Sequence, residues 1–266
     1  MSLLNPSNGR SIQAVILDMD GVLWRGSEPI GDLPAIFSRF DHKGWKVALA
    51  TNNATRAPVQ FVEKLRQFGV EVDPHLVINS AQAAAEYLKK MYPGGGPVYV
   101  IGEEGLLGSL AEQGFYHDEN DPLAVVVALD RRLTYDHLRI ANHLIQSGAP
   151  FIGANPDRTL PTPEGPIPGS GAILAALEAS SGVKPTIVGK PHPEMYKVVL
   201  TRMGVAPENA LVVGDRLETD IAGGIAAGCL TGLVLTGVST ESAARNSPYA
   251  PDFIARDLTA LIDELI

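Results

Sequence analysis

The sequence predicts an α/β protein built on a mostly parallel sheet, with a second, smaller α/β domain inserted into it. The first indication is a regular alternation of short apolar runs with amphipathic stretches, which is the pattern of successive βα units. The second is that the apolar runs are nearly continuous, as in strands covered by helices on both faces. The third is a middle region with its own strands and helices, enough for a separate small domain.

The bulk composition restricts the class of partner. Of the 266 residues, 45% are apolar and 19% charged, a balance typical of globular proteins. The net charge is −9 without a lysine/arginine cluster, so no nucleic-acid partner is expected, because such a contact needs a positive surface. The longest apolar run, Leu123 to Leu129, is too short to span a bilayer, so no membrane partner is expected. The single Cys229 fits a reducing compartment, and a cytoplasmic location is expected.

The expected elements alternate along the chain. The strands are Ala14–Leu17, Lys46–Ala50, Pro97–Ile101, Leu123–Leu129, Pro150–Ala154, Thr186–Val188, Ala210–Val213 and Thr231–Leu235. The helices between them include Val59–Phe68, Ala81–Met91, Tyr135–Ser147, Glu194–Met203 and Asp220–Ala227. In a sheet of this kind, ligands gather at the carboxyl ends of the strands.

Two stretches predict where the inserted domain begins and ends. One lies around Val77–Ser80, and the other is the proline- and glycine-rich passage Asn155–Gly171 with the small-residue helix that follows it. We therefore expect a core of residues 1–79 and 181–266, and an inserted domain of residues 80–180.

The first strand ends in two carboxylates, Asp18 and Asp20, which lead into a turn at Gly21. Burying two like charges is expensive unless a cation neutralises them. The arrangement therefore indicates a Mg²⁺ site in which one carboxylate acts as a nucleophile and the other as an acid/base. Taken alone, the segment is also compatible with a strand whose aspartates cap the following turn.

Three further segments carry polar side chains at strand ends. They are Thr51–Asn53, Lys190, and Asp215 followed by Asp220. Because the carboxyl ends of parallel strands converge, these side chains should meet Asp18 and Asp20. The collection offers oxygen ligands for a metal and hydrogen-bond donors for phosphoryl oxygens.

Each of these segments has a second interpretation. Thr51–Asn53 could cap the next helix. Lys190 could be a solvated surface lysine, although Pro191 favours an extended turn there. Asp220 could cap its own helix or reach the outer shell of the metal.

In order, the four segments resemble the motifs of the haloacid dehalogenase-like hydrolase superfamily. Asp18-Met-Asp-Gly-Val-Leu is similar to its first motif, Thr51 to its second, Lys190 to its third, and Gly214-Asp215 with Asp220 to its fourth. The finer resemblance is to the capped NagD-like branch, which includes nitrophenylphosphatases, phosphoglycolate phosphatases and pyridoxal phosphate phosphatases. It is carried by Thr51-Asn-Asn-Ala-Thr-Arg56, Asn155-Pro-Asp157, Pro168-Gly-Ser-Gly171 and Gly189-Lys-Pro-His-Pro193.

The resemblance implies a Rossmann-like parallel-sheet core with an inserted α/β cap, and a Mg²⁺-dependent phosphomonoester hydrolase. It implies that Asp18 forms an aspartyl-phosphate and that Asp20 is the acid/base. The metal ligands would be Asp18, the main-chain carbonyl of Asp20, and Asp215, with Asp220 behind them. The phosphate would be held by Thr51, Asn52, Asn53 and Lys190.

The resemblance also implies a small-molecule substrate such as nitrophenyl phosphate, phosphoglycolate, pyridoxal phosphate or a nucleotide monophosphate, and a homodimer formed through the cap. Two other functions remain open. One is phosphoryl transfer of the phosphomutase type. The other is a non-enzymatic switch with a phosphorylated aspartate, against which Asp20 and the inserted domain both argue.

Overall fold

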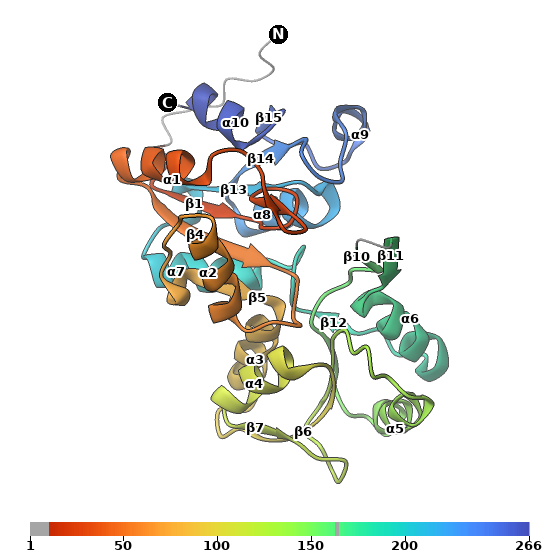
Figure 1. Cartoon of the computed structure of the whole chain (residues 1–266). Coiled ribbons are helices and arrows are strands. Elements are labelled where there is room, and N and C mark those ends of the chain that lie inside the picture. The colour runs from red at the N-terminus through yellow and green to blue at the C-terminus, as the bar shows by residue number, and fades with distance from the viewer. Residues whose placement is uncertain (1–10, 163–164, 266) are drawn as a thin grey trace. The chain divides into compact units, whose positions relative to one another are not determined.

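The computed structural model describes residues 11–162 and 165–265 as a mixed α/β protein (Figure 1), which confirms the predicted fold class. The chain divides into two compact units. The first unit is Met1–Thr51, Pro58–Ile78 and Lys190–Ile266, and the second unit is Asn52–Ala57 and Asn79–Gly189. The assignment of residues 80–180 to an inserted cap stays a prediction.

The first unit contains a six-stranded sheet with the strand order β15-β14-β13-β1-β4-β5. The strands β15, β14, β13, β1 and β4 are parallel to their neighbours, so their carboxyl ends lie on one edge. The bounds are β1 (Ala14–Leu17), β4 (Lys46–Thr51), β5 (Val77–Asn79), β13 (Ala210–Gly214), β14 (Leu230–Val234) and β15 (Phe253–Ala255).

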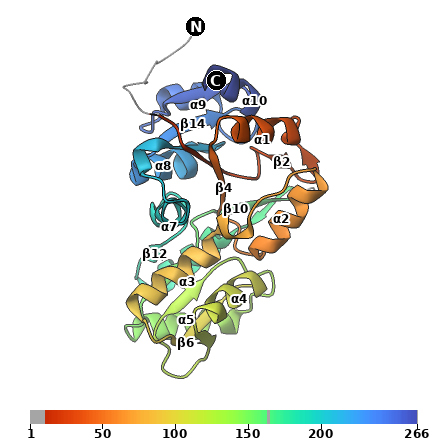
Figure 2. The same cartoon turned by 90° about the vertical axis from the view of Figure 1, so that its left-hand side faces the viewer.

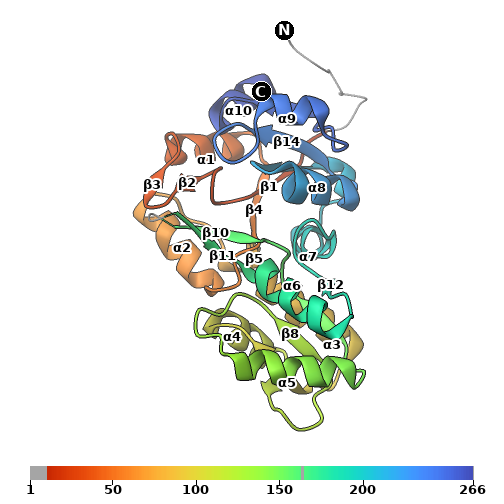
Figure 3. The same ribbon diagram turned by 90° about the vertical axis from the view of Figure 1, so that its right-hand side faces the viewer.

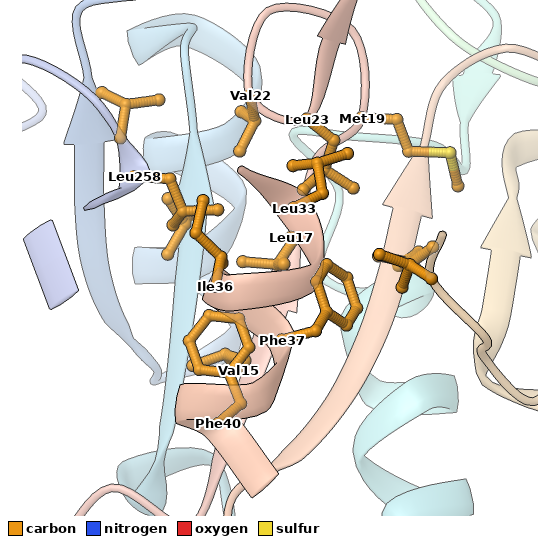
Figure 4. Packing of buried hydrophobic residues seen from close by; sticks show 14 of the residues in the cluster. Val15, Leu17, Met19, Val22, Leu23, Leu33, Ile36, Phe37, Phe40 and Leu258 are labelled. Atoms are coloured by element: carbon orange, nitrogen blue, oxygen red, sulfur yellow. The ribbon is translucent and has the colours of Figure 1, made fainter. Parts of the chain in front are cut away.

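One face of this sheet carries the largest apolar cluster. Leu17 on β1 is in register with Val213 on β13 and Leu49 on β4, and all three point into the cluster because alternate residues share a face. Three helices also contribute to the cluster: α1 (Leu33–His42), α2 (Pro58–Gln67) and α10 (Leu258–Leu265). Figure 4 shows side chains of α1 against those of β1 and Leu258.

The helices α7 (Glu194–Met203) and α8 (Ala222–Ala227) pack against each other, α7 against β4 and α8 against β14. A Cβ on Gly224 would lie 2.7 Å from Cγ2 of Thr231 and 3.0 Å from Cβ of Val212. The glycine therefore lets α8 approach the sheet closely. Residue Val212 alternates with the residues that face the large cluster, so α8 lies on the other face.

The remaining elements of the first unit are short. They are the antiparallel pair β2 (Trp24–Arg25) and β3 (Glu28–Pro29), the helix α9 (Glu241–Asn246), the 3-10 turns Pro74–Leu76 and Pro207–Asn209, and a π-helical turn Leu217–Ile221.

The second unit contains a five-stranded parallel sheet with the strand order β12-β9-β8-β6-β7 and an antiparallel hairpin, β10-β11. The bounds are β6 (Gly96–Ile101), β7 (Phe115–His117), β8 (Val125–Val127), β9 (Phe151–Gly153), β10 (Thr159–Thr162), β11 (Gly165–Pro168) and β12 (Thr186–Ile187).

Four helices belong to the second unit: α3 (Ser80–Met91), α4 (Glu104–Glu112), α5 (Tyr135–Gln146) and α6 (Ser170–Ser181). The helices α5 and α6 pack side by side (Figure 3) and share an apolar cluster with β6, β8 and β9. The helices α3 and α4 pack against each other, as Figure 2 shows. Within the residues that the structure describes, no helix is long and apolar enough to cross a membrane.

Two segments differ from the sequence-based expectation. The passage Asn155–Gly171 was expected to mark the end of the inserted domain and was assigned no strand, and it contains the hairpin β10-β11. The helix expected to start at Asp220 starts at Ala222, after the π-helical turn. Within that turn, the Asp220 side chain accepts a hydrogen bond from the Arg216 N–H at 3.1 Å, so the carboxylate holds the turn that precedes the helix.

The stability of the first unit should depend on Phe40, which is 1% exposed and packs its ring on Phe37 and Trp45. We expect Phe40→Ala to lower the free energy of unfolding by about 3–5 kcal/mol, because it leaves a cavity in the cluster. Both tryptophans of the chain, Trp24 and Trp45, lie in this unit, so urea unfolding followed by tryptophan fluorescence reports on it.

The matched control is Val59→Ala on α2, whose side chain is 61% exposed. Its effect should stay within about 0.5 kcal/mol. Equal losses for the two variants would contradict the assignment of Phe40 to the core.

Candidate active site

The site of the first unit lies where β13, β1 and β4 end. Asp18 follows β1, Thr51 is the last residue of β4, and Asp215 follows β13. These strands are adjacent and parallel, so their ends open on the same edge of the sheet, as expected for a ligand site in this architecture.

Lys190 lies between two carboxylates. Its Nζ is 2.5 Å from Oδ1 of Asp18 and 2.6 Å from Oδ1 of Asp220, and it also donates to the carbonyl of Ala50 at 3.0 Å. The residue is 3% exposed, so it is not the solvated surface lysine that remained an alternative. A buried ammonium is tolerated when it is paired and hydrogen-bonded in this way.

The pKa values of Lys190 and Asp18 reflect both their burial and the charges around them. Burial alone would lower the pKa of Lys190, but the charges of Asp18 and Asp220 outweigh it and hold that pKa well above its ordinary value. Burial raises the pKa of Asp18 well above its usual range, against the opposing charge of Lys190. The charges of Asp220 and Asp215 raise the same pKa further, so one ammonium does not compensate all the carboxylate charge gathered here.

Asp215 completes the group of carboxylates. Its Oδ2 accepts a hydrogen bond from the Val238 N–H at 2.7 Å, whereas its buried Oδ1 has no hydrogen-bond partner. Burial, with the charge of Asp220, raises the pKa of Asp215 to about 6. A buried oxygen without a partner is rare in folded proteins and indicates a ligand or a strained group.

The carboxylates of Asp18, Asp215 and Asp220 can hold a divalent metal ion. One oxygen of each lies within 4.8 Å of the others. When ionised, the three carboxylates and the Lys190 ammonium leave two negative charges in excess, which a divalent cation balances. Oxygen ligands alone favour Mg²⁺, Ca²⁺ or Mn²⁺ over softer metals, and the partnerless Oδ1 of Asp215 supplies a ligand position.

Asp20 is exposed and lies in the turn after β1. Its Oδ1 accepts a hydrogen bond from the Trp24 indole N–H at 2.7 Å, which restrains the side chain that we predict to be the acid/base. Within the described residues, the carboxylate cluster is formed by Asp18, Asp215 and Asp220. That the main-chain carbonyl of Asp20 binds the metal stays a prediction.

The residues Thr51, Asn52 and Asn53 fall into different units. Thr51 is buried in the first unit, and Asn52 and Asn53 belong to the second. The carbonyl of Asn52 accepts hydrogen bonds from Ser80 at 2.6 Å and from Asn155 at 2.7 Å.

The side-chain amide of Asn52 donates to Oδ1 of Asp157 at 3.2 Å. Oδ1 of Asn53 accepts hydrogen bonds from the N–H and the hydroxyl of Thr55. Asn53 therefore stabilises its own turn, and its contact with a phosphate stays a prediction.

Sequence reasoning quoted Gly214 within a motif but missed that the carboxylates require glycine at positions 214 and 237. A Cβ on Gly214 would lie 2.1 Å from Cβ of Asp220, and a Cβ on Gly237 would lie 1.8 Å from Oδ2 of Asp215. Both positions need glycine because a neighbouring carboxylate occupies the space. The sequence carries one signal for this requirement, a glycine next to a polar residue near the end of a strand. Gly214 directly precedes Asp215, and Gly237 directly follows Thr236.

Comparison with known proteins identifies the family. Residues 15–116 match the family described as haloacid dehalogenase-like hydrolase, and residues 187–261 match a related HAD-hydrolase-like family. An acid sugar phosphatase from Staphylococcus aureus is 35% identical over 96% of this chain and 99% of its own length.

Two solved structures are similar over nearly the whole chain. The 4-nitrophenylphosphatase from Thermotoga maritima has a TM-score of 0.89 at 34% identity and covers 95% of this chain and 97% of its own. NagD from E. coli K-12 has a TM-score of 0.87 at 33% identity and covers 93% of this chain and 97% of its own.

The chain therefore belongs to the haloacid dehalogenase-like hydrolases, in the branch of phosphatases that contains NagD and the nitrophenylphosphatases. The resemblance predicted from the motifs is confirmed, and so is the enzyme class, a phosphoric monoester hydrolase.

The buried position of Lys190 makes a prediction for stability in a metal-free buffer. Lys190→Met leaves Asp18 and Asp220 without their shared cation, so the free energy of unfolding should fall by about 3–5 kcal/mol. The measurement is urea unfolding in EDTA, followed by tryptophan fluorescence.

The matched control is Lys197→Met on α7. Its ammonium pairs with Glu194 at 2.9 Å, and its side chain is 54% exposed. An exposed pair of this kind contributes at most about 1 kcal/mol. A loss at Lys190 no larger than the loss at Lys197 would mean that Lys190 does not compensate the buried carboxylates.

Proposed function

We propose that this chain is a Mg²⁺-dependent phosphomonoester hydrolase that acts through an aspartyl-phosphate on Asp18. The observation that carries the proposal is the arrangement around Asp18: a buried ammonium at 2.5 Å on one side, and on the other a group of carboxylates that includes a partnerless oxygen. A nucleophilic carboxylate needs positive charge beside it, because an approaching phosphate is itself negative; the Lys190 ammonium and a cation bound by the carboxylates would supply that charge.

In the first step, a carboxylate oxygen of Asp18 forms a bond to phosphorus as the bond from phosphorus to the substrate's ester oxygen breaks. Asp20 gives a proton to that oxygen, so the alcohol leaves neutral. In the second step, Asp20 takes a proton from a water molecule that attacks phosphorus, which releases inorganic phosphate and restores Asp18. Thr51, Asn52, Asn53 and Lys190 would hold the phosphoryl oxygens.

Mg²⁺ bound to Asp18, the carbonyl of Asp20 and Asp215 would supply charge stabilisation for the phosphoryl group. Asp220 would act behind these ligands by holding Lys190, to which it is bonded at 2.6 Å.

The substrate would be a small phosphomonoester. The relatives are named for activity on sugar phosphates and nitrophenyl phosphate, and phosphoglycolate, pyridoxal phosphate and nucleotide monophosphates are further candidates. Residues 80–180 would form the cap that contacts the organic part of the substrate and would join two copies into a homodimer. The protein would act in the cytoplasm.

The test is a panel of these phosphomonoesters, with phosphate release measured in Mg²⁺ and in EDTA. We expect release in Mg²⁺ and its loss in EDTA. Transfer of the phosphoryl group between substrates without release would support a phosphomutase. A stable phosphoaspartate without turnover would support a phospho-acceptor switch.

Asp18→Asn removes the attacking charge and keeps the shape of the side chain. We expect phosphate release to fall by about 10³-fold or more, because the nucleophile of a covalent mechanism is lost. The fold should persist, as circular dichroism would show. Asp41→Asn is the matched control, since Asp41 is an exposed residue of α1. Substantial activity in Asp18→Asn would exclude the covalent mechanism.

Asp20→Asn should damage the first step more for alkyl phosphates than for nitrophenyl phosphate, because a poor leaving group needs the proton most. Single-turnover measurements separate this step from the hydrolysis of the intermediate. The aspartyl-phosphate should then accumulate, since the base for its hydrolysis is also lost. An equal loss for both leaving groups in the first step would remove Asp20 from acid catalysis.

A further inference from the structure

The segment Thr236–Ser239, which follows β14, holds Asp215 from two sides. The Val238 N–H donates to Oδ2 of Asp215 at 2.7 Å, and the Ser239 N–H donates to its main-chain carbonyl at 3.0 Å. The hydroxyl of Ser239 in turn accepts a hydrogen bond from the Leu217 N–H at 3.1 Å. The carboxylate and its backbone are therefore both tied to this segment.

The same segment is bound to the turn that carries Asp20. The Thr236 hydroxyl donates to the carbonyl of Gly21, and the Arg25 guanidinium donates to the carbonyl of Thr236. Gly21 directly follows Asp20 in the chain. Thr236–Ser239 thus connects the carboxylate after β13 with the turn after β1.

Two glycines let the backbone approach the carboxylate. A Cβ on Gly237 would lie 1.8 Å from Oδ2 of Asp215, and a Cβ on Gly21 would lie 2.7 Å from the same oxygen. Gly21 also has a φ of +89°, which disfavours other residues. Gly237 has no such backbone constraint, so its substitution tests the available space alone.

The two oxygens of Asp215 are consequently different. Oδ2 is engaged by the segment, whereas Oδ1 is buried without a hydrogen-bond partner. We propose that Thr236–Ser239 is a positioning segment that engages Oδ2 of Asp215, so that the carboxylate presents Oδ1 alone to a divalent cation. This inference rests on the metal dependence in the proposed function.

One oxygen per carboxylate is the arrangement that suits Mg²⁺. Mg²⁺ requires near-octahedral geometry with short bonds, whereas Ca²⁺ accepts both oxygens of a carboxylate at longer distances. A carboxylate released from Val238 could rotate and offer both oxygens. By engaging one oxygen of Asp215, the segment therefore favours Mg²⁺ over Ca²⁺.

The test is calorimetric titration of the full chain with Mg²⁺ and, separately, with Ca²⁺, without substrate. In Gly237→Ala the Mg²⁺ Kd should rise about 10-fold or more, as for other groups that orient a metal ligand. The Ca²⁺ Kd should change less, so that the preference for Mg²⁺ shrinks. Thr236→Val removes only the hydroxyl that binds Gly21 and should shift the Mg²⁺ Kd in the same direction by a smaller factor.

Gly94→Ala is the matched control, because a Cβ there meets no atom within 4 Å and the backbone has no positive φ. It should leave both Kd values unchanged. If Gly237→Ala fails to fold, Thr236→Val decides, and a wild-type Mg²⁺ Kd in Thr236→Val then overturns the proposal. Equal loss of Mg²⁺ and Ca²⁺ affinity in Gly237→Ala also overturns it.

The wild-type titration separates this inference from the proposed function. Mg²⁺ binding in the wild type with unaffected variants overturns the positioning role alone. If the wild-type protein does not bind Mg²⁺, both the positioning role and the proposed metal dependence are overturned. Variants that shift the Kd as expected support the positioning role even if the wild type hydrolyses none of the phosphomonoesters.

Discussion

An excess of negative charge, buried at the ends of adjacent strands, is the constraint on which the rest of the first unit depends. Asp18, Asp215 and Asp220 offer three carboxylates, and Lys190 supplies one ammonium between two of them. Burial makes each uncompensated charge costly, and the raised pKa values of Asp18 and Asp215 express that cost. A divalent cation would balance the charge that Lys190 leaves uncompensated, which is the physical basis of the metal site that we propose.

The three aspartate carboxylates of the site are chemically identical, but their surroundings give each one different hydrogen-bond partners. Asp18 is bonded to Lys190, and Asp220 is bonded both to Lys190 and to the Arg216 N–H. Asp215 receives a backbone N–H on one oxygen and has no partner on the other. Glycines at 214 and 237 make these close approaches possible, because any Cβ there would overlap a carboxylate. Backbone N–H groups and the absence of a side chain at the two glycines thus shape the site as much as its charged residues do.

The chain passes between its two units beside residues that we predict to hold phosphate. Thr51 belongs to the first unit and Asn52 to the second, and Gly189 belongs to the second and Lys190 to the first. Asn52 is tied within the second unit through its carbonyl and its amide. Lys190 is tied within the first through Asp18, Asp220 and Ala50. At these two crossings, Asn52 and Lys190 are therefore each anchored by hydrogen bonds within their own unit.

The sequence by itself determined the α/β class, most strands, and the segments that carry the site. Continuous apolar runs such as Ala14–Leu17 and Ala210–Val213 follow from local chemistry, because a strand covered on both faces must be apolar throughout. Aspartates directly after such runs, in the order of a known set of motifs, identified the family that the comparisons confirm. The hairpin β10-β11 was not predictable, because its prolines and glycines also suit an irregular loop.

Only the tertiary structure decided how the site residues are paired. Lys190 and Asp18 are 172 positions apart, and Val238 and Asp215 are 23 apart across a strand and a helix. No local pattern predicts which carboxylate oxygen receives the ammonium, which receives a backbone N–H, and which is left without a partner. Those outcomes depend on chain segments that come close together only when the sheet is assembled. The reason is that hydrogen bonds and charge pairs act over a few ångströms in space, whatever the separation of the residues along the chain.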